Sequence, residues 1–81
     1  MNKCYFDLSK LSPGKKAYVH SHGAVGNMLR RLLDIGLIEN TEVECVGVSP
    51  AGGISAYLIR GAVIALRNED AALITVYSLG E

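Results

Sequence analysis

Apolar residues recur at three- and four-residue intervals along positions 25–36, which is the spacing of a helix that buries one face. The polar residues of this stretch fall mostly on the other face. Gly36 ends the pattern, because glycine readily takes the left-handed conformation that closes a helix, and Leu37 can make the apolar contact that often follows. The sequence predicts a helix with its capping region at Ser21 or Gly23 and its end at Gly36. The expected buried positions are Val25, Met28, Leu29, Leu32, Leu33 and Gly36.

Alternating apolar and polar residues predict strands on both sides of this helix. Ahead of the helix, Ala17 and Val19 share one face of the first strand. In the strand that follows the helix, the alternation changes phase at Gly47, which predicts a bulge or a sharp bend. Farther along, Ile64 and Leu66 are expected core residues. The expected strands are residues 15–20, 42–48, 54–59, 62–67 and 73–77.

Residues with a preference for turns separate the predicted strands. Near the start, Leu8 and Leu11 predict a short segment that packs on the domain. After the helix, Asn40 predicts a turn, because asparagine tolerates a positive φ better than other non-glycine residues. Asn68 followed by two acidic residues predicts a single helical turn. Further turns are expected at Pro13-Gly14, Ser49–Gly53 and Arg60-Gly61.

This order of elements is typical of a small, mainly β, SH3-like barrel of five strands. One α-helix lies between the first and second predicted strands, and a short helical turn at Asn68–Ala72 precedes the last strand. A chain of 81 residues is expected to form a single domain over residues 1–81. The hydrophobic content of 49%, without tryptophan, indicates a folded core of small side chains.

The charges of the chain cancel, with eight basic and eight acidic residues. No summed field attracts polyanions, so nucleic acid is not an expected partner. The chain has no secretory segment and no apolar run long enough to span a bilayer, so contact with a membrane is expected only through a partner. Cys4 and Cys45 are isolated thiols without metal-ligand spacing, which indicates a cytoplasmic protein with reduced cysteines.

Two histidines form the candidate metal site. His20 and His22 stand two residues apart, and in an extended segment such residues project to the same side. They are a candidate pair of ligands for iron or zinc. Zinc generally takes four ligands and ferrous iron favours carboxylates as well, so two solvated loop histidines are the alternative interpretation.

The predicted helix and the 49–53 loop carry the candidate partner-binding residues. The two arginines of the helix lie beside Asp34, so surface ion pairing explains them, but a guanidinium can also dock on an acidic or phosphate group of a partner. The loop is either a recognition loop or a plain hairpin connection. The candidate residues are Arg30, Arg31, Ser49, Gly52 and Gly53.

The remaining side chains indicate a binding protein rather than an enzyme. No catalytic triad, phosphate-binding loop or pair of carboxylates occurs at a credible spacing. The tyrosines are expected on exposed strand faces, although a groove for proline-rich peptides would be poorly furnished without tryptophan. These tyrosines are Tyr5, Tyr18, Tyr57 and Tyr77.

Several short stretches, in their order and spacing, resemble the FeoA family of ferrous iron transport proteins. The likeness covers nearly the whole chain, from Leu8 to Val76. Many relatives have a Pro-Gly pair where this chain has Glu39-Asn40, so the turn there depends on asparagine. The stretches are Arg30–Leu37, Thr41–Val43, Arg60-Gly61, Ile64–Arg67 and Ala71–Val76.

The resemblance implies an SH3-like, cytoplasmic protein that accompanies FeoB, a membrane permease for ferrous iron with its own GTP-hydrolysing domain. It implies an accessory or regulatory role through contact with the cytosolic domains of that permease. The resemblance also implies transition-metal binding. The alternative function is therefore that of a direct sensor or chaperone of ferrous iron or zinc, which would use His20 and His22. No cofactor is expected to be required, and self-association through an open barrel edge stays open.

Overall fold

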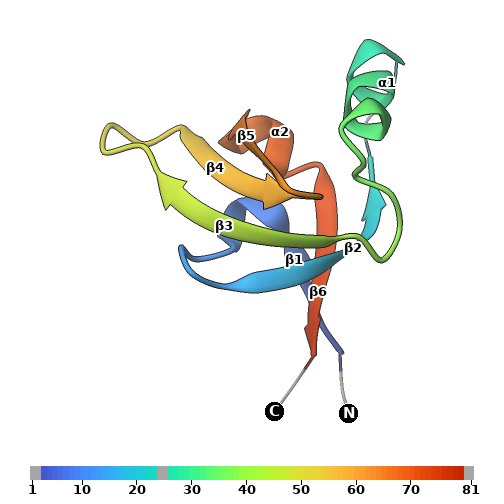
Figure 1. Cartoon of the computed structure of the whole chain (residues 1–81), viewed down its shortest axis with the longest axis horizontal. Helices are drawn as coiled ribbons and strands as arrows, with labels where there is room; N and C mark the ends of the chain where they lie inside the picture. The colour runs from blue at the N-terminus through green and yellow to red at the C-terminus, as the bar shows by residue number, and fades with distance from the viewer. Residues whose placement is uncertain (1–2, 24–25, 80–81) are drawn as a thin grey trace.

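Six antiparallel strands form one curled sheet in the order β1-β6-β2-β3-β4-β5. The structure is a computed structural model and describes residues 3–23 and 26–79. Figure 1 shows the strands wrapping around a common interior, with α1 standing at one corner. None of the helices in the described ranges has the length and apolar character needed to cross a bilayer. The elements are β1 (Lys3–Asp7), the 3-10 helix η1 (Leu8–Lys10), β2 (Lys16–His22), α1 (Gly26–Asp34), β3 (Glu42–Val48), β4 (Ile54–Ile59), β5 (Ala62–Arg67), α2 (Asn68–Ala71) and β6 (Ile74–Leu79).

The SH3-like architecture predicted from the sequence is confirmed, with one strand more than expected. The additional strand is β1, which pairs with β6 from Lys3 opposite Leu79 to Asp7 opposite Thr75. Helix α1 therefore follows the second strand rather than the first. The expected count was five because β1 is short and its pairing partner lies at the other end of the chain, where no local pattern reveals it.

The interior is built from alternate residues of the strands, as their period requires. Ala17, Val19, Val43 and Cys45 are buried, and Leu66 is buried beside a half-buried Ile64 that packs on the core. The bulge expected at Gly47 is confirmed, because the pairing of β3 with β4 shifts between Cys45 and Gly47. The other buried apolar residues of the core are Leu8, Leu11, Leu32, Leu37, Tyr57, Ile59, Ala71, Ile74 and Val76.

Two predicted turns depend on residues with positive φ. Asn40 has a φ of 69° and its backbone N–H donates to the Val19 carbonyl at 2.7 Å, so this turn also secures β2. Arg60 and Gly61 have φ values of 51° and 84° between the paired residues Ile59 and Ala62. Positive φ at both central residues defines a type I′ turn, whose twist matches that of the strands it joins.

The end of α1 follows the predicted pattern. Gly36 has a φ of 90°, the Leu37 N–H donates to the Leu32 carbonyl at 3.0 Å, and the Gly36 N–H donates to the Leu33 carbonyl at 3.0 Å. These two bonds form a Schellman motif, and buried Leu32 and Leu37 supply its apolar component. The side chain of Arg60 lies directly over this end, since a Cβ built on Gly36 would stand 2.3 Å from the Arg60 Cδ.

Other expectations for the helix are wrong or lie outside the described residues. Leu33 is 46% exposed, because the helix meets the barrel near Leu32 and turns its next residue away. Ser21 belongs to β2 and is not a helix cap. Val25 and the side chains of Met28 and Leu29 lie outside what the structure describes.

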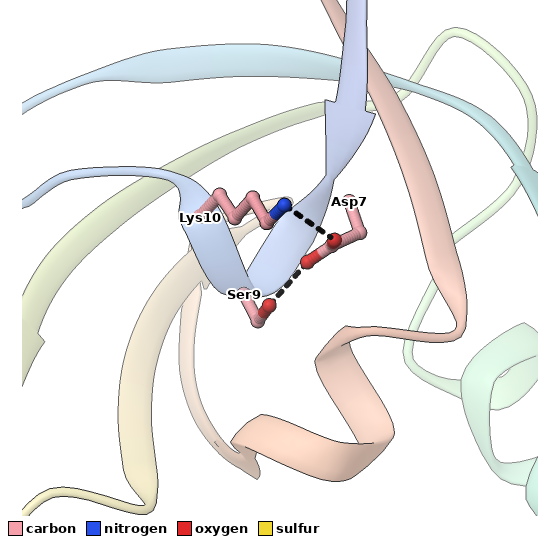
Figure 2. Close-up of polar contacts among 3 residues, drawn as sticks. All are labelled: Asp7, Ser9 and Lys10. Carbon is pink, nitrogen blue, oxygen red and sulfur yellow. Dashed lines mark hydrogen bonds and ion pairs between the residues drawn. The ribbon is translucent and has the colours of Figure 1, made fainter.

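A polar corner joins β1 to η1. Figure 2 shows Asp7 between Ser9 and Lys10: the Ser9 hydroxyl donates to one carboxylate oxygen, and the Lys10 ammonium lies 3.9 Å from the other. The adjoining Leu8 is fully buried. The two contacts therefore fix the backbone where the chain leaves β1, and this places Leu8 in the core.

Tyr57 is the largest fully buried side chain, although the sequence suggested an exposed position. It stands opposite buried Cys45 on the inner face of β4, and its hydroxyl donates to the Leu8 carbonyl at 3.2 Å. Burial raises the pKa of the Tyr57 phenol above its ordinary value of 10.0, because the phenolate is poorly solvated there.

This shift predicts a loss of stability in alkali. The folded chain keeps the Tyr57 proton at a pH at which the unfolded chain releases it. The contribution of Tyr57 to the free energy of unfolding is therefore complete below about pH 10 and falls as the pH rises further. The measurement is the free energy of unfolding in urea from about pH 8 to about pH 11 for the protein and for Tyr57→Phe. The variant keeps the other tyrosines and should lose less stability over this range. Equal slopes for the two proteins would show that Tyr57 does not contribute.

Candidate interaction site

The two arginines proposed from the sequence as partner contacts are exposed on α1. Arg30 lies beside Leu33 and Asp34 along a shallow depression of about 370 Å³. Arg31 lines a different groove of about 400 Å³ together with Arg67 and Asp70. The ion pairs found within residues 3–23 and 26–79 are Lys10 with Asp7 and Arg67 with Glu69. The expected pairing of the arginines with Asp34 is therefore not observed.

The 49–53 loop lies apart from these arginines. Figure 1 shows the β3–β4 loop and α1 at opposite ends of the longest axis of the molecule. The loop is ordered by its own backbone, because the Gly52 N–H donates to the Ser49 carbonyl at 2.9 Å. The Gly53 carbonyl accepts from the Asn68 N–H at 2.8 Å, which ties the loop to α2. The proposed partner-binding residues are thus divided between two surfaces.

His20 and His22 both lie on β2, but in different surroundings. The ring of His20 packs edge-on against Tyr5 with centroids 5.0 Å apart, at a register shift between Val19 and Ser21. His22 is half-buried, and its Nδ1 has no hydrogen-bond partner among the residues that the structure describes. In the same part of the chain, no group of three or more His, Cys, Asp or Glu side chains is placed to hold a metal ion. The two imidazoles alone do not complete a site, and the metal site stays a prediction.

Three tyrosines form a row across the outer face of β1, β6 and β2. Tyr77 is the centre, opposite Tyr5 on one side and Tyr18 on the other, with ring centroids 6.0 and 5.5 Å away. The Lys3 ammonium lies 4.4 Å from the centre of the Tyr77 ring. Tyr77 is only 8% exposed because these neighbours cover it, whereas Tyr5 is 53% exposed and Tyr18 is half-buried. The sequence placed tyrosines on strand faces but could not show that three of them meet.

An acidic groove of about 450 Å³ lies beside this row. It is formed by the turn after α1, the start of β3 and the β4–β5 corner, so residues distant in the sequence meet there. Neither of the two ion pairs named above involves its carboxylates. The side chains that give the groove its character are Glu39, Glu42, Glu44, Ile38, Leu58 and Arg60.

Two hydrogen bonds join the tyrosine row to the groove. The Tyr77 hydroxyl donates to the Asn40 side-chain oxygen at 2.8 Å, and the Tyr18 hydroxyl donates to Glu42 at 3.5 Å. Asn40 and Glu42 both line the groove. Row and groove are therefore one continuous surface, here named the tyrosine–glutamate face and defined by Tyr5, Tyr18, Tyr77, Glu39, Glu42 and Glu44. Sequence reasoning missed it, although the spacing of Glu42 and Glu44 on one face of a predicted strand was a signal.

Comparisons with known proteins agree with this architecture. Among solved structures, the chain is similar to the FeoA protein from Chlorobium tepidum, with 31% identity and a TM-score of 0.86 over 93% of this chain and 71% of that chain. It is similar to iron(II) transport protein A from Clostridium thermocellum, with 32% identity and a TM-score of 0.83 over 88% of this chain and 44% of that one.

A third similar structure is Stenotrophomonas maltophilia FeoA complexed with zinc, described as an SH3 domain protein, with 27% identity and a TM-score of 0.78 over 88% of each chain. A comparison with curated proteins gave no match. The family model of the FeoA domain matches residues 6–78, which reach from β1 to β6. The chain therefore belongs to the FeoA domain family, which is associated with ferrous iron transport.

Proposed function

We propose that the protein is a cytoplasmic accessory protein of ferrous iron uptake that binds the cytosolic part of a FeoB-type permease and adjusts its assembly or activity. The observation that carries the proposal is the match of the FeoA domain model to residues 6–78. A similar chain with 32% identity is described as an iron(II) transport protein. The family supplies a pathway, and the pathway requires a partner that crosses the membrane.

The surface of the molecule supports binding rather than catalysis. Its grooves are shallow and lined by mixed polar and apolar side chains, which suits contact with another protein. Arg30 and Arg31 present exposed guanidinium groups on α1, and these can form bidentate contacts with carboxylates of a partner. We include them, with Ser49, Gly52 and Gly53 at the other end of the molecule, as candidate contacts.

The test is a titration of the protein against the purified cytosolic domains of the FeoB-type permease from the same genome, with and without guanine nucleotide and ferrous iron. Saturable binding is expected, and Arg30→Glu with Arg31→Glu should weaken it about tenfold through lost charge pairing. The control is Lys15→Glu, which reverses an exposed charge away from α1, is compared with Arg30→Glu alone, and should leave the affinity nearly unchanged. Absence of binding in every state would contradict the proposal, and unchanged affinity of the arginine variant would remove α1 from the interface.

A direct metal-binding role is the second candidate function. It is favoured by the Nδ1 of His22, which has no hydrogen-bond partner among residues 3–23 and 26–79 and lies two residues from His20 on β2. The same protein is titrated with ferrous iron and with zinc, alongside His20→Ala with His22→Ala. Uptake tighter than about micromolar that depends on the histidines, together with no binding to the permease, would assign the function to the metal. Weaker uptake, or uptake unchanged in the variant, would contradict this candidate.

A further inference from the structure

The groove of the tyrosine–glutamate face has an acidic lining although the chain as a whole is neutral. Two lysines stand next to the groove but outside its lining: Lys3 over the Tyr77 ring, and Lys16 opposite Glu44 on β2. Glu39, Glu42 and Glu44 line the groove together with a single guanidinium, that of Arg60, so the lining carries a net negative charge. Glu39 and Glu42 are exposed and Glu44 is half-buried. Neither ion pair in the described part of the chain neutralises any of the three. The groove therefore presents carboxylates to a positively charged ligand.

The tyrosine row already holds one cation from the chain itself. The Lys3 ammonium lies 4.4 Å from the Tyr77 ring centre, within the distance at which a ring quadrupole attracts a cation. The rings of Tyr5 and Tyr18 on either side keep part of their surface open. Lys3 is thus an intramolecular example of the contact that a lysine or arginine of a partner could make on this row.

The groove also offers apolar surface. Ile38 is 47% exposed at its wall and half-buried Leu58 lines it from β4. An apolar side chain placed there would be removed from water while neighbouring basic side chains reach the carboxylates. This combination fits a polypeptide segment best. A free cation would not use the apolar surface, and the carboxylates would repel an anionic lipid.

We propose that the tyrosine–glutamate face docks a cytosolic segment of the permease that adjoins its membrane helices and carries lysine or arginine. The inference rests on the proposed function and names the part of the partner that is bound. Cytoplasmic loops next to membrane helices carry an excess of lysine and arginine, so such segments are complementary in charge to this face. Arginine is the favoured residue, because its planar guanidinium pairs with a carboxylate through two hydrogen bonds and stacks on an aromatic ring.

The experiment uses fluorescently labelled synthetic peptides that cover those permease segments, and fluorescence polarisation of each peptide with the full chain. Glu42→Gln with Glu44→Gln should lower the affinity about tenfold, because each exposed ion pair contributes modestly and two are lost. Asp34→Asn with Glu69→Gln removes the same charge from other surfaces and should bind as the unchanged protein does. Binding should also weaken as salt is raised, and peptides with glutamine in place of lysine and arginine should not bind.

The outcomes separate this inference from the proposed function. Equal affinities for the two double variants, or failure of every basic peptide to bind while the intact cytosolic domains do, would overturn the docking of a basic segment and leave the permease as the partner. Failure of the intact cytosolic domains to bind in any state would overturn the proposed function itself. Thermal unfolding of both variants checks that each is folded, which is expected because glutamine matches glutamate in shape.

Discussion

Replacing Tyr57 with alanine is expected to lower the free energy of unfolding by about 4 kcal/mol, because a fully buried aromatic side chain is removed from a close-packed core. A domain of this size has little more stability than that to lose. Tyr57 also links two parts of the barrel, since it packs from β4 while its hydroxyl reaches the Leu8 carbonyl. We expect the variant to be only marginally stable, with an unfolded fraction detectable at room temperature by circular dichroism and a strongly lowered urea midpoint.

Tyr57→Phe separates the ring from the hydroxyl. Its cost should be about 1 kcal/mol, the usual net contribution of one hydrogen bond. The Leu8 carbonyl keeps a second donor in this variant, the Leu11 N–H at 3.1 Å, so it is not left unsatisfied. A phenylalanine variant as unstable as the alanine variant would show that the hydroxyl, and not the packing of the ring, accounts for the effect.

Gly36→Ala is the substitution with the second largest expected effect, about 2 kcal/mol. A residue with a Cβ at a φ of 90° carries backbone strain, and here the new Cβ also meets the Arg60 Cδ at 2.3 Å. The long side chain of Arg60 can move aside, which limits the steric part of the cost. The measurement is the free energy of unfolding in urea.

Two further variants divide this cost into its parts. Gly14→Ala tests the backbone strain alone, because Gly14 has a φ of 85° and no atom beyond its own chain neighbours lies within 4 Å of a Cβ built there. It should lose about 1 kcal/mol. In an Arg60→Ala background, the cost of Gly36→Ala in free energy of unfolding should fall to the same value as that of Gly14→Ala. Equal costs for Gly14→Ala and Gly36→Ala, with the cost of Gly36→Ala unchanged by Arg60→Ala, would show that the contact between Arg60 and the helix end contributes nothing.

Local features of this fold could be predicted from the sequence. The end of α1 at Gly36, the turn at Asn40 and the corner at Arg60-Gly61 each depend on a few neighbouring residues with special backbone preferences. The three-stranded meander from β3 to β5 was also predicted with its observed bounds. Hairpins join adjacent segments, so their pairing follows from the alternation and the turn between them.

Features that join distant segments could not be predicted in this way. The pairing of β1 with β6 brings together the two ends of the chain, and the tyrosine row exists only because of that pairing. The acidic groove is assembled from three places in the sequence. Tyr57 and Tyr77 were expected to be exposed, because the alternation of a strand does not show which face the neighbouring strands will cover.

The pairing of Lys3 with Leu79 has a practical consequence for any fusion or tag. Both ends of the described chain leave the sheet at the same place, next to Lys3 and the Tyr77 ring that it covers. A peptide or domain joined directly to Lys3 or Leu79 would start beside the tyrosine row and obstruct the surface proposed to dock the permease segment. A reporter inserted in the β3–β4 loop would stand clear of the tyrosine row, because that loop projects from the far side of the barrel (Figure 1), but it would interrupt the candidate contacts Ser49, Gly52 and Gly53.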